Sequence, residues 1–370
     1  MFDNLFLTAA IVFVGSFLAV RILTPKITWV VESRNLADAP DNRSSHKVTT
    51  PTMAGFAFFL VLLFSLAFIR EWDTDTIGIN LVASLALMFA IGLKDDLVLS
   101  TPKAKIMAEL LAISFVIFCS CFQSFSLDGF LGIYNMPSIL NYLIIPVIIL
   151  AIINSYNLID GIDGLATTVG IMTFAIFGVI FYFGGEYFYF LLSLALIGIL
   201  LAYLPFNLSS SKKIFMGDTG SLIIGFCIGF MSIKFLSMEH LTLIDSQFQP
   251  ENKLIVIAAI LFIPLFDTIR VMGVRMLKKK SPFSPDKSHI HHILINCGIP
   301  HFKASFFLCF LNLVISVSLI FLSFSLNSFQ MILVMALLFI ALLGLFHKFD
   351  THKEKRKPFI YLIRTIQFLF

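Results

Sequence analysis

Eleven long apolar runs restrict what this chain can fold into more than any other feature. Each approaches the roughly 20 apolar residues that an α-helix needs to cross a bilayer. Charged residues make up 13% of the chain, against about 25% in soluble domains, and the mean hydropathy is +0.95. The sequence therefore predicts an all-α polytopic membrane protein. The expected spans are 5–23, 53–69, 77–93, 106–122, 139–153, 166–183, 187–204, 221–236, 254–271, 305–324 and 329–346.

The distribution of positive charge predicts the orientation. Connections that follow odd-numbered spans share one side of the membrane. All but three of the 26 Lys and Arg residues lie in or beside these connections and the C-terminal tail, the exceptions being Arg70, Lys234 and Lys253. By the positive-inside rule this side is cytoplasmic. We therefore expect about eleven transmembrane helices, with a periplasmic N-terminus, a cytoplasmic C-terminus, one transmembrane domain over 1–346 and a basic cytoplasmic tail over 347–370.

Five aspartates lie at the ends of apolar runs, all of them in odd connections. Asp95 and Asp96 close the third run, Asp160 and Asp163 follow the fifth, and Asp218 precedes the eighth. Adjacent carboxylates repel each other and need a cation or another positive group nearby. Taken singly, the Asp95–Asp96 pair also fits a solvated helix end, and Asp218 also fits an N-cap. Together they predict one acidic site at the cytoplasmic face.

The segment NSYNLIDGIDGLA carries the strongest single signal. Its two Asp-Gly units place Asp160 and Asp163 three residues apart, which predicts neighbouring positions on one helical turn. Asn154 and Asn157 have the same spacing. Four oxygen-bearing side chains at the end of an apolar span are more than a turn requires, so we expect them to bind a ligand.

Basic residues lie beside these acidic ones. Lys103 and Lys105 open the fourth run, where they can meet an anionic substrate or simply reach toward the interface. Asp267, at the end of the ninth span, can pair with Arg270 or Arg275.

A histidine cluster, His289, His291 and His292, lies in the longest odd connection. With Cys297 it could bind zinc, but it lacks the i, i+4 pairing of a helical zinc site. Donation from the imidazoles to phosphate oxygens fits the setting better.

Electrostatics joins these groups into one hypothesis. Phosphates and carboxylates repel each other, so a site with this many aspartates handles phosphates only through a bridging dication. Oxygen ligands from Asp and Asn suit Mg²⁺ or Mn²⁺. The lysines and histidines would neutralise the remaining oxygens, as is usual in phosphoryl transfer. An ion-coupled transporter is the alternative from another class, although transporters place such acids near the bilayer midplane.

These motifs resemble the polyprenyl-phosphate N-acetylhexosamine-1-phosphate transferases. That family shares an eleven-helix membrane fold, a DD pair, an NxxNxxDGxDGL segment, a GDxGS segment and a histidine-rich loop, which recur here in order from Asp95 to His292. The patch SSHKVTTPTMAG at 44–55 resembles the family's entry to its second span, with Ala54 in place of a usual glycine. That departure puts close packing at this turn in doubt. The stretch SPFSPDKSHIHHIL resembles the WecA-like branch, whose members use UDP-GlcNAc and undecaprenyl phosphate.

The resemblance implies a role for each motif. Asp218 and Asn157 would hold Mg²⁺ or Mn²⁺ against the diphosphate. Asp160 and Asp163 would help to form the nucleotide site, and Asp95 or Asp96 would take a proton from the lipid phosphate. Lys105 or Lys103 and the histidine cluster would contact phosphate or sugar groups. The candidate catalytic residues are therefore Asp95, Asp96, Asp160, Asp163, Lys105, His289, His291 and His292, and the donor-binding ones are Asn154, Asn157, Asp160, Asp163 and Lys103.

The expected reaction moves N-acetylglucosamine 1-phosphate from UDP-GlcNAc to undecaprenyl phosphate and releases UMP. It would initiate the synthesis of a lipid-linked envelope polysaccharide such as O antigen. The same chemistry with another UDP-N-acetylhexosamine, or with UDP-MurNAc-pentapeptide, stays open. Expected partners are the UDP-sugar, the lipid acceptor and the membrane. No nucleic acid is expected, and a homodimer is left open.

Overall fold

The computed structural model describes residues 4–34, 50–98, 101–119, 126–134, 137–238, 248–282 and 288–351. In these ranges the chain is helical apart from short connections and one isolated bridge between Phe130 and Ile133, so the all-α prediction is confirmed. The helices are α1 (Leu5–Ser33), α2 (Ala54–Ile69), η1 (Arg70–Trp72), α3 (Gly78–Leu97), α4 (Pro102–Ile117), α5 (Ser138–Ile159), α6 (Leu165–Phe183), α7 (Tyr187–Asn207), α8 (Gly217–Ser237), η3 (Pro250–Asn252), α9 (Lys253–Ile260), α10 (Phe262–Leu277), α11 (Ile290–Asn296), α12 (His301–Leu322) and α13 (Ser328–Thr351).

The number of membrane-spanning helices is close to the prediction. Within the described ranges, nine helices are long and apolar enough to cross a membrane, and the bent pair α9–α10 makes ten if it forms one span. The remaining candidate, α4, has 16 residues and lies beside α3 and α5 in the bundle. α13 continues to Thr351, so the predicted basic tail begins inside a helix, and 352–370 lie outside the described residues.

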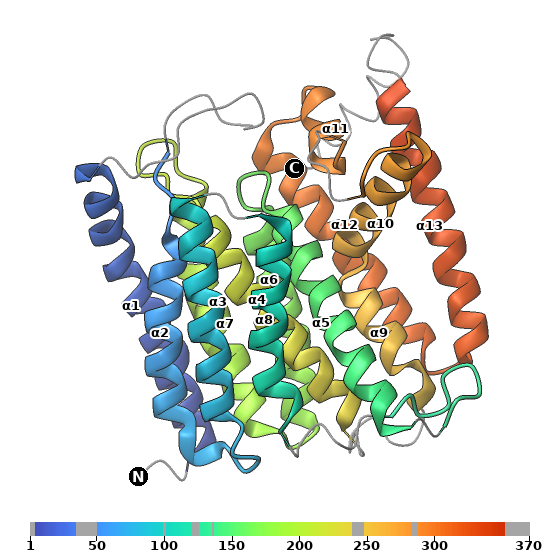
Figure 1. Cartoon of the computed structure of the whole chain (residues 1–370), viewed down its shortest axis with the longest axis horizontal. Coiled ribbons are helices and arrows are strands. Elements are labelled where there is room, and N and C mark those ends of the chain that lie inside the picture. The colour runs from blue at the N-terminus through green and yellow to red at the C-terminus, as the bar shows by residue number, and fades with distance from the viewer. Residues whose placement is uncertain are drawn as a thin grey trace.

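The helices alternate in direction, and the C-terminal end of α3 and the α5–α6 and α7–α8 connections lie at the upper end of the bundle in Figure 1. We call this the motif end, defined by Asp95, Asp160 and Asp218. At the opposite end, Lys234 Nζ lies 2.9 Å from Asp75 Oδ2 and 2.8 Å from Glu186 Oε1. The predicted alternation of the connections between two ends is therefore present in the structure.

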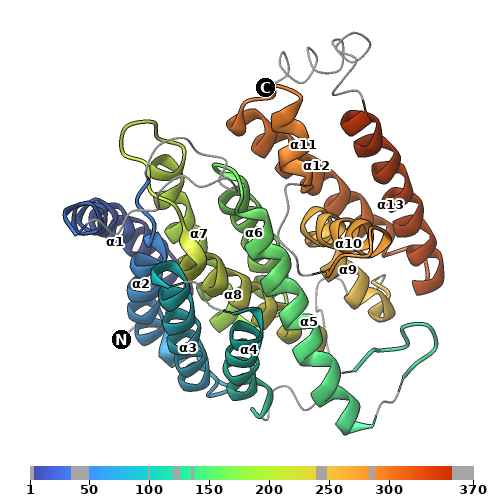
Figure 2. The same ribbon diagram turned by 45° about the horizontal axis from the view of Figure 1, so that its top comes forward.

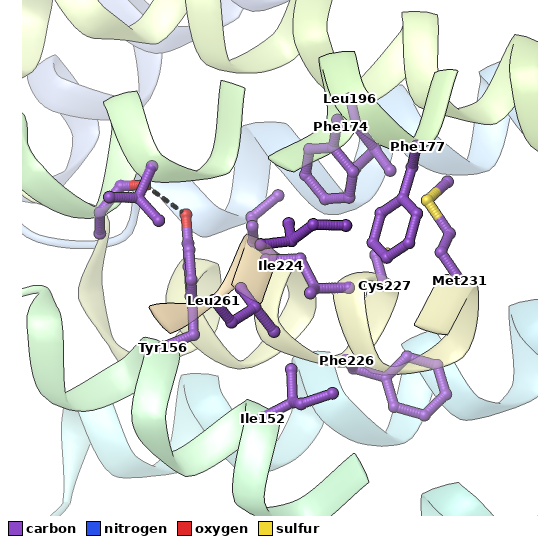
Figure 3. Packing of buried hydrophobic residues seen from close by; sticks show 14 of the residues in the cluster. Ile152, Tyr156, Phe174, Phe177, Leu196, Ile224, Phe226, Cys227, Met231 and Leu261 are labelled. Carbon is purple, nitrogen blue, oxygen red and sulfur yellow. Dashed lines mark hydrogen bonds between the residues drawn. The ribbon is translucent and has the colours of Figure 1, made fainter. Parts of the chain in front are cut away.

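Helix α8 forms the centre of the bundle. It packs against α2, α3, α5, α6 and α9, and every residue of its apolar segment is buried. Figure 2 shows α8 enclosed by its neighbours, while α10, α12 and α13 lie on the far side of α5 and α6. In Figure 3, Ile224 and Cys227 of α8 pack near Phe174 and Phe177 of α6. Because this packing fixes α8 firmly, its N-terminal Gly217 and Asp218 have a defined position at the motif end.

A hydrogen bond joins α5 to α6 beneath the Asp-Gly segment. The buried Tyr156 hydroxyl donates to the Ala166 carbonyl at 2.7 Å, shown as the dashed line in Figure 3. Tyr156 lies one turn before the end of α5, and Ala166 lies in the first turn of α6. The two helices therefore hold residues 160–164 between fixed ends.

The ninth predicted span is broken at Leu261, where α9 and α10 meet at 74°. Pro264 has no N–H to donate to the Ile260 carbonyl, as an unbroken helix would require. The buried Asn312 of α12 supplies the missing partners, because its Nδ2 donates to the Ile260 carbonyl at 2.8 Å and its Oδ1 accepts from the Ile263 N–H at 2.8 Å. One amide thus satisfies both sides of the break, as buried backbone groups require.

We expect Asn312→Leu to destabilise the protein, because the substitution leaves one buried carbonyl and one buried N–H unsatisfied. Each such group costs about 1–3 kcal/mol, so the total for the two is ~2–6 kcal/mol. Thermal unfolding of the purified protein in detergent measures the loss. Ser316→Ala is the matched control, because Ser316 donates to the nearby Ala259 carbonyl at 2.8 Å and its loss removes only a donor. Equal effects of the two substitutions would contradict the role of Asn312.

Candidate active site

Asp96 of α3 caps the N-terminus of α8. Its Oδ1 accepts from the Asp218 N–H at 2.7 Å, and its Oδ2 accepts from the Thr219 N–H at 3.1 Å and from the Thr219 hydroxyl at 2.5 Å. Sequence alone suggested that Asp218 might cap its own helix, but the cap comes from α3. A carboxylate at this position satisfies otherwise unpaired N–H groups and interacts favourably with the helix dipole. Asp96 therefore fixes the position of Asp218.

Two glycines allow this close approach. Gly217 has φ +72°, and a Cβ there would lie 2.7 Å from Asp96 Oδ2. Gly55 of α2 packs directly on Gly220 of α8, and a Cβ at Gly55 would overlap the Gly220 backbone. The neighbouring Ala54 is fully buried and its N–H donates to the Phe215 carbonyl at 3.2 Å. The close packing that Ala54 put in doubt is therefore present.

Lys105 joins two carboxylates from different helices. Its Nζ lies 3.0 Å from Asp95 Oδ2 of α3 and 3.3 Å from Asp218 Oδ1 of α8. Lys105 itself is in the first turn of α4. Since an ammonium between two carboxylates relieves their repulsion, this residue holds three helix ends together. Lys103, by contrast, is exposed and has no ion pair in the part of the chain that the structure describes.

The two predicted asparagines point to different partners. Asn157 Nδ2 donates to Asp218 Oδ1 at 2.5 Å and to the Ser221 hydroxyl at 2.7 Å, which places Asn157 in the site. Asn154 Nδ2 donates to Glu109 Oε2 at 3.3 Å and to the Leu150 carbonyl at 2.9 Å. Asn154 therefore faces α4 and lies beside the Asp218 centre rather than in it.

Asp160 and Asp163 do not share a helical turn, so this prediction is wrong. α5 ends at Ile159, residues 160–164 form a turn, and α6 begins at Leu165. α5 and α6 do not form one continuous helix, because Gly164, the N-cap of α6, adopts φ +83° and its N–H donates to Asn207 Oδ1 at 2.6 Å.

The two carboxylates of this turn nevertheless face the same site. Asp163 Oδ2 lies 2.6 Å from Lys213 Nζ and 3.6 Å from His301 Nδ1. The pKa of Asp160 is raised well above its usual value, first because protein surrounds the carboxyl group and then because Asp218, Asp96 and Asp163 repel its charge. Asp160 as a whole residue has intermediate surface exposure. The carboxylates of α3, the Asp-Gly turn and α8 therefore form one acidic site.

His289 is held by Asp267 rather than being free for a substrate. His289 Nδ1 lies 2.8 Å from Asp267 Oδ2, and Asp267 Oδ1 accepts from Arg270 at 2.8 Å and from the Ile290 N–H at 3.0 Å. The predicted pairing of Asp267 with Arg270 is confirmed, while Arg275 donates instead to the Pro282 carbonyl at 2.6 Å. This arrangement anchors the start of α11 to α10.

His291 connects the histidine cluster with the Asp-Gly turn. It is buried against Gly161, where a Cβ would overlap His291 Nε2. Burial, followed by the neighbouring His292, lowers the pKa of His291 to about 3, so its ring is neutral. Neither ring nitrogen has a hydrogen-bond partner among the described residues. His292 is half-buried and its ring centroid lies 4.3 Å from that of His291.

In the described ranges, no three His, Cys, Asp or Glu side chains are arranged as a ready ligand set for a metal. The acidic groups instead contact ammonium groups, Asp218 and Asp95 with Lys105, and Asp163 with Lys213. The donor chemistry still suits a hard dication, because the side chain of Asn157 lies against the Asp218 carboxylate and further carboxylates raise the pKa of Asp160. The site therefore has an excess of negative charge that a dication would offset.

Several residues of the site were missed by sequence reasoning. Lys213 and His301 contact Asp163, and the Ser305 hydroxyl donates to the Asp163 carbonyl at 2.6 Å. Glu109 is a fully buried acid of α4. Glu109 gave a usable signal, because it is the one acidic residue inside the apolar run 106–122 and intramembrane acids are usually functional. His301 and Ser305 gave none, because only the tertiary fold brings α12 to the Asp-Gly turn.

Comparisons with known proteins identify the family. The family model "Glycosyl transferase family 4" matches residues 79–236. The chain is 30% identical over 285 residues to "Decaprenyl-phosphate N-acetylglucosaminephosphotransferase" of Mycolicibacterium smegmatis, covering 72% of this chain and 70% of that protein. It is 29% identical over 320 residues to "Probable undecaprenyl-phosphate N-acetylglucosaminyl 1-phosphate transferase" of Bacillus subtilis, covering 86% of each. It is also 29% identical over 273 residues to "Undecaprenyl-phosphate alpha-N-acetylglucosaminyl 1-phosphate transferase" of Escherichia coli K12, covering 73% of this chain and 71% of that protein.

A set of apolar helices with an acidic, lysine-bridged site at one end defines a membrane enzyme of phosphoryl transfer. The chain belongs to glycosyl transferase family 4, and it is a glycosyl-1-phosphate transferase. The predicted family resemblance is confirmed.

Proposed function

We propose that the protein transfers N-acetylglucosamine 1-phosphate from UDP-GlcNAc to undecaprenyl phosphate and releases UMP. The observation that carries the proposal is the meeting of Asp95, Lys105 and Asp218 from three helices, which provides charges of both signs for two phosphate-bearing substrates. The names of the relatives support the sugar and the polyprenyl acceptor. We further propose that the product initiates a lipid-linked envelope polysaccharide such as O antigen.

We propose that Asp218 and Asn157 hold Mg²⁺ or Mn²⁺. When bound, the dication would supply charge neutralisation for the donor diphosphate. The residues of the chain do the remaining work. Lys105 keeps Asp95 and Asp218 together, while Asp160, Asp163 and the neutral His291 line the side on which we place the nucleotide and sugar.

Asp95 is the better candidate for the base. The carboxylate of Asp96 accepts three hydrogen bonds from the start of α8, so its oxygens are engaged in positioning Asp218. We propose that Asp95 takes the proton of the lipid phosphate. The freed phosphate oxygen then forms a bond to the β-phosphorus of the donor as the bond from that phosphorus to the bridging oxygen breaks, and UMP leaves with the bridging oxygen.

We propose that the motif end faces the cytoplasm of a bacterial inner membrane. Of the three basic residues assigned to the opposite end, Lys234 and Lys253 are buried in ion pairs, Lys253 with Asp128 at 2.7 Å. The positive-inside rule counts Lys and Arg residues rather than net charge, so the excess of these residues at the motif end is what supports this orientation.

The test is a reaction with purified protein, UDP-GlcNAc, Mg²⁺ and undecaprenyl phosphate, in which UMP and the lipid-linked sugar are both measured. We expect equal amounts of the two products, and no UMP without the lipid. Parallel reactions with UDP-GalNAc and with UDP-MurNAc-pentapeptide show which sugar donor the enzyme prefers. Preference for either of these over UDP-GlcNAc would refute the assignment of the sugar, and solute uptake into vesicles without any lipid product would instead support a transporter.

We expect stability in the absence of a dication to fall as pH rises. The pKa of Asp160 is raised from its usual 3.8, so the native state holds a proton that the unfolded chain releases. Native stability from this group is therefore full below about pH 3.8 and is lost as pH rises toward the elevated pKa. Thermal unfolding between pH 5 and 8 measures the slope. Saturating Mg²⁺ should reduce it, and Asp160→Asn should remove most of it; an unchanged slope in that variant would contradict the assignment to Asp160.

A further inference from the structure

Glu109 lies one helical turn below the site and has no assigned role. Its side chain is fully buried in α4. One oxygen, Oε2, accepts from Asn154 Nδ2 at 3.3 Å, whereas Oε1 is buried and has no hydrogen-bond partner among the described residues. A buried carboxylate oxygen without a donor is costly, so it requires an explanation. The surroundings of Glu109 provide one.

Lys105 is the nearest mobile cation. It precedes Glu109 by four residues on α4, and side chains at this spacing lie on the same face of a helix. Glu109 interacts electrostatically with Lys105, Asp218 and Asp95. The lysine side chain is a flexible four-carbon stem with three donors, so its ammonium can move between acceptors on this face.

The position of Lys105 creates a conflict with a dication at Asp218. The ammonium lies 3.3 Å from Asp218 Oδ1, so it occupies the side of this carboxylate that faces Asp95. A dication bound to Asp218 brings two positive charges close to the ammonium, and like charges at such distances repel strongly in a partly buried site. Lys105 must then leave Asp218. An acceptor that is already buried and lacks a donor is available at Glu109 Oε1.

We propose that Glu109 is a positioning residue that provides a second location for the Lys105 ammonium. In the metal-free protein Lys105 joins Asp95 to Asp218, as observed. When a dication binds Asp218, the ammonium moves away from Asp218 and pairs with Glu109 Oε1, still close to Asp95. No covalent bond is broken in this exchange. The proposal rests on the metal role of Asp218 proposed above, and it adds that Glu109 lowers the cost of binding the metal.

A purely structural role of Glu109 makes a different prediction. If Glu109 only holds Asn154, then Glu109→Gln should change little, because the glutamine carbonyl accepts the same hydrogen bond. If Glu109 accepts Lys105, the substitution removes the charge that receives the ammonium. The effect of Glu109→Gln on metal binding must then depend on the presence of Lys105. A double-mutant cycle measures this dependence.

The experiment measures Mn²⁺ binding to the purified full chain by the loss of the free-ion EPR signal, without nucleotide or lipid. We expect Glu109→Gln to weaken binding by about tenfold, which corresponds to ~1.4 kcal/mol. Lys105→Met should bind Mn²⁺ at least as tightly as the native protein, because no ammonium competes. In the Lys105→Met background, adding Glu109→Gln should change affinity by less than about threefold, because no ammonium remains for Glu109 to accept. Glu251→Gln, at the opposite end where Glu251 accepts from Ser328, is the matched control and should bind normally.

The outcomes separate this proposal from the metal role itself. Asp218→Asn must lose Mn²⁺ binding; if it binds normally, the proposed metal role fails whatever Glu109 does. If Asp218→Asn loses binding but Glu109→Gln has equal effects with and without Lys105, or no effect in either background, the second location for Lys105 is overturned. Glu109→Asp is a second variant that keeps the charge on a shorter side chain. It should retain tighter Mn²⁺ binding than Glu109→Gln, and equal affinity of the two variants would also overturn the proposal.

Discussion

Asp218→Asn should reduce turnover by at least about 10³-fold while the protein remains folded, since charge stabilisation by a bound dication contributes several kcal/mol to such a reaction. The fold should survive because an asparagine keeps the size of the side chain, and the cap of α8 is made by the Asp218 backbone N–H rather than its carboxylate. Initial rates of UMP release, measured with UDP-GlcNAc, undecaprenyl phosphate and Mg²⁺, provide the measurement.

The control for Asp218→Asn is Asp350→Asn. Asp350 is an exposed carboxylate of α13 outside the site, so this substitution removes the same charge without touching the carboxylates around Lys105. Its rate should equal that of the native protein. Near-native turnover by Asp218→Asn, or equal losses in both variants, would show that Asp218 does not hold the metal.

Asp95→Asn and Asp96→Asn should distinguish a residue that takes part in the reaction from one that positions the helices. In Asp96→Asn the amide group faces donors at the start of α8, so at least one buried hydrogen bond to a charged acceptor is lost. We expect this substitution to cost ~2–4 kcal/mol of stability as well as activity. Asp95→Asn leaves the ion pair of Lys105 with Asp218 in place, so the melting temperature should change little. Its turnover should fall by about 10²–10⁴-fold, the usual loss when a general base is removed.

The measurements are thermal unfolding and initial rates on both variants at the same pH. The pattern that would reverse the assignment is an unchanged melting temperature with lost turnover in Asp96→Asn, together with near-native turnover in Asp95→Asn. Asp96 would then be the base, and its three hydrogen bonds to α8 would not determine its role. Because the two residues are adjacent, differences in membrane depth cannot explain such a contrast.

Much of the fold was predictable because the membrane limits the choice of structure. Apolar runs of near-spanning length must form helices, and their alternation puts Asp95, Asp160 and Asp218 at one end. Counting the spans along the sequence therefore predicted that these three residues lie at the same end of the bundle. The bend at Leu261 was less predictable, although Pro264 gave a local signal, because its stability depends on Asn312 from a helix distant in the sequence.

The residue types of the site were predictable, but their individual contacts were not. Sequence grouped Asp95 with Asp96, yet one pairs with Lys105 and the other caps α8. It grouped Asn154 with Asn157, yet they bond to acids on different helices. Adjacent side chains point in different directions on a helix, and side chains three positions apart share a face without sharing a partner. Only the packing of α3, α4 and α8 decides what each one meets.

Charge balance links the fold to the proposed chemistry. The buried α8 holds Asp218 in place, α3 supplies its cap, and α4 supplies the ammonium that keeps Asp95 and Asp218 together. The acidic groups exceed the ammonium groups that contact them, and the proposed dication would offset the remaining negative charge. With that dication bound, negatively charged phosphates could bind among carboxylates that would otherwise repel them.

The central claim is that these carboxylates hold a dication against the donor diphosphate. Pulsed ENDOR on the protein with bound Mn²⁺ and UDP-GlcNAc tests it most directly, because a ³¹P coupling reports phosphate oxygens bound to the metal. We predict a ³¹P coupling in the native protein that disappears in Asp218→Asn. A native protein that binds UDP-GlcNAc with no ³¹P coupling to Mn²⁺, or the same coupling in Asp218→Asn, would contradict the account.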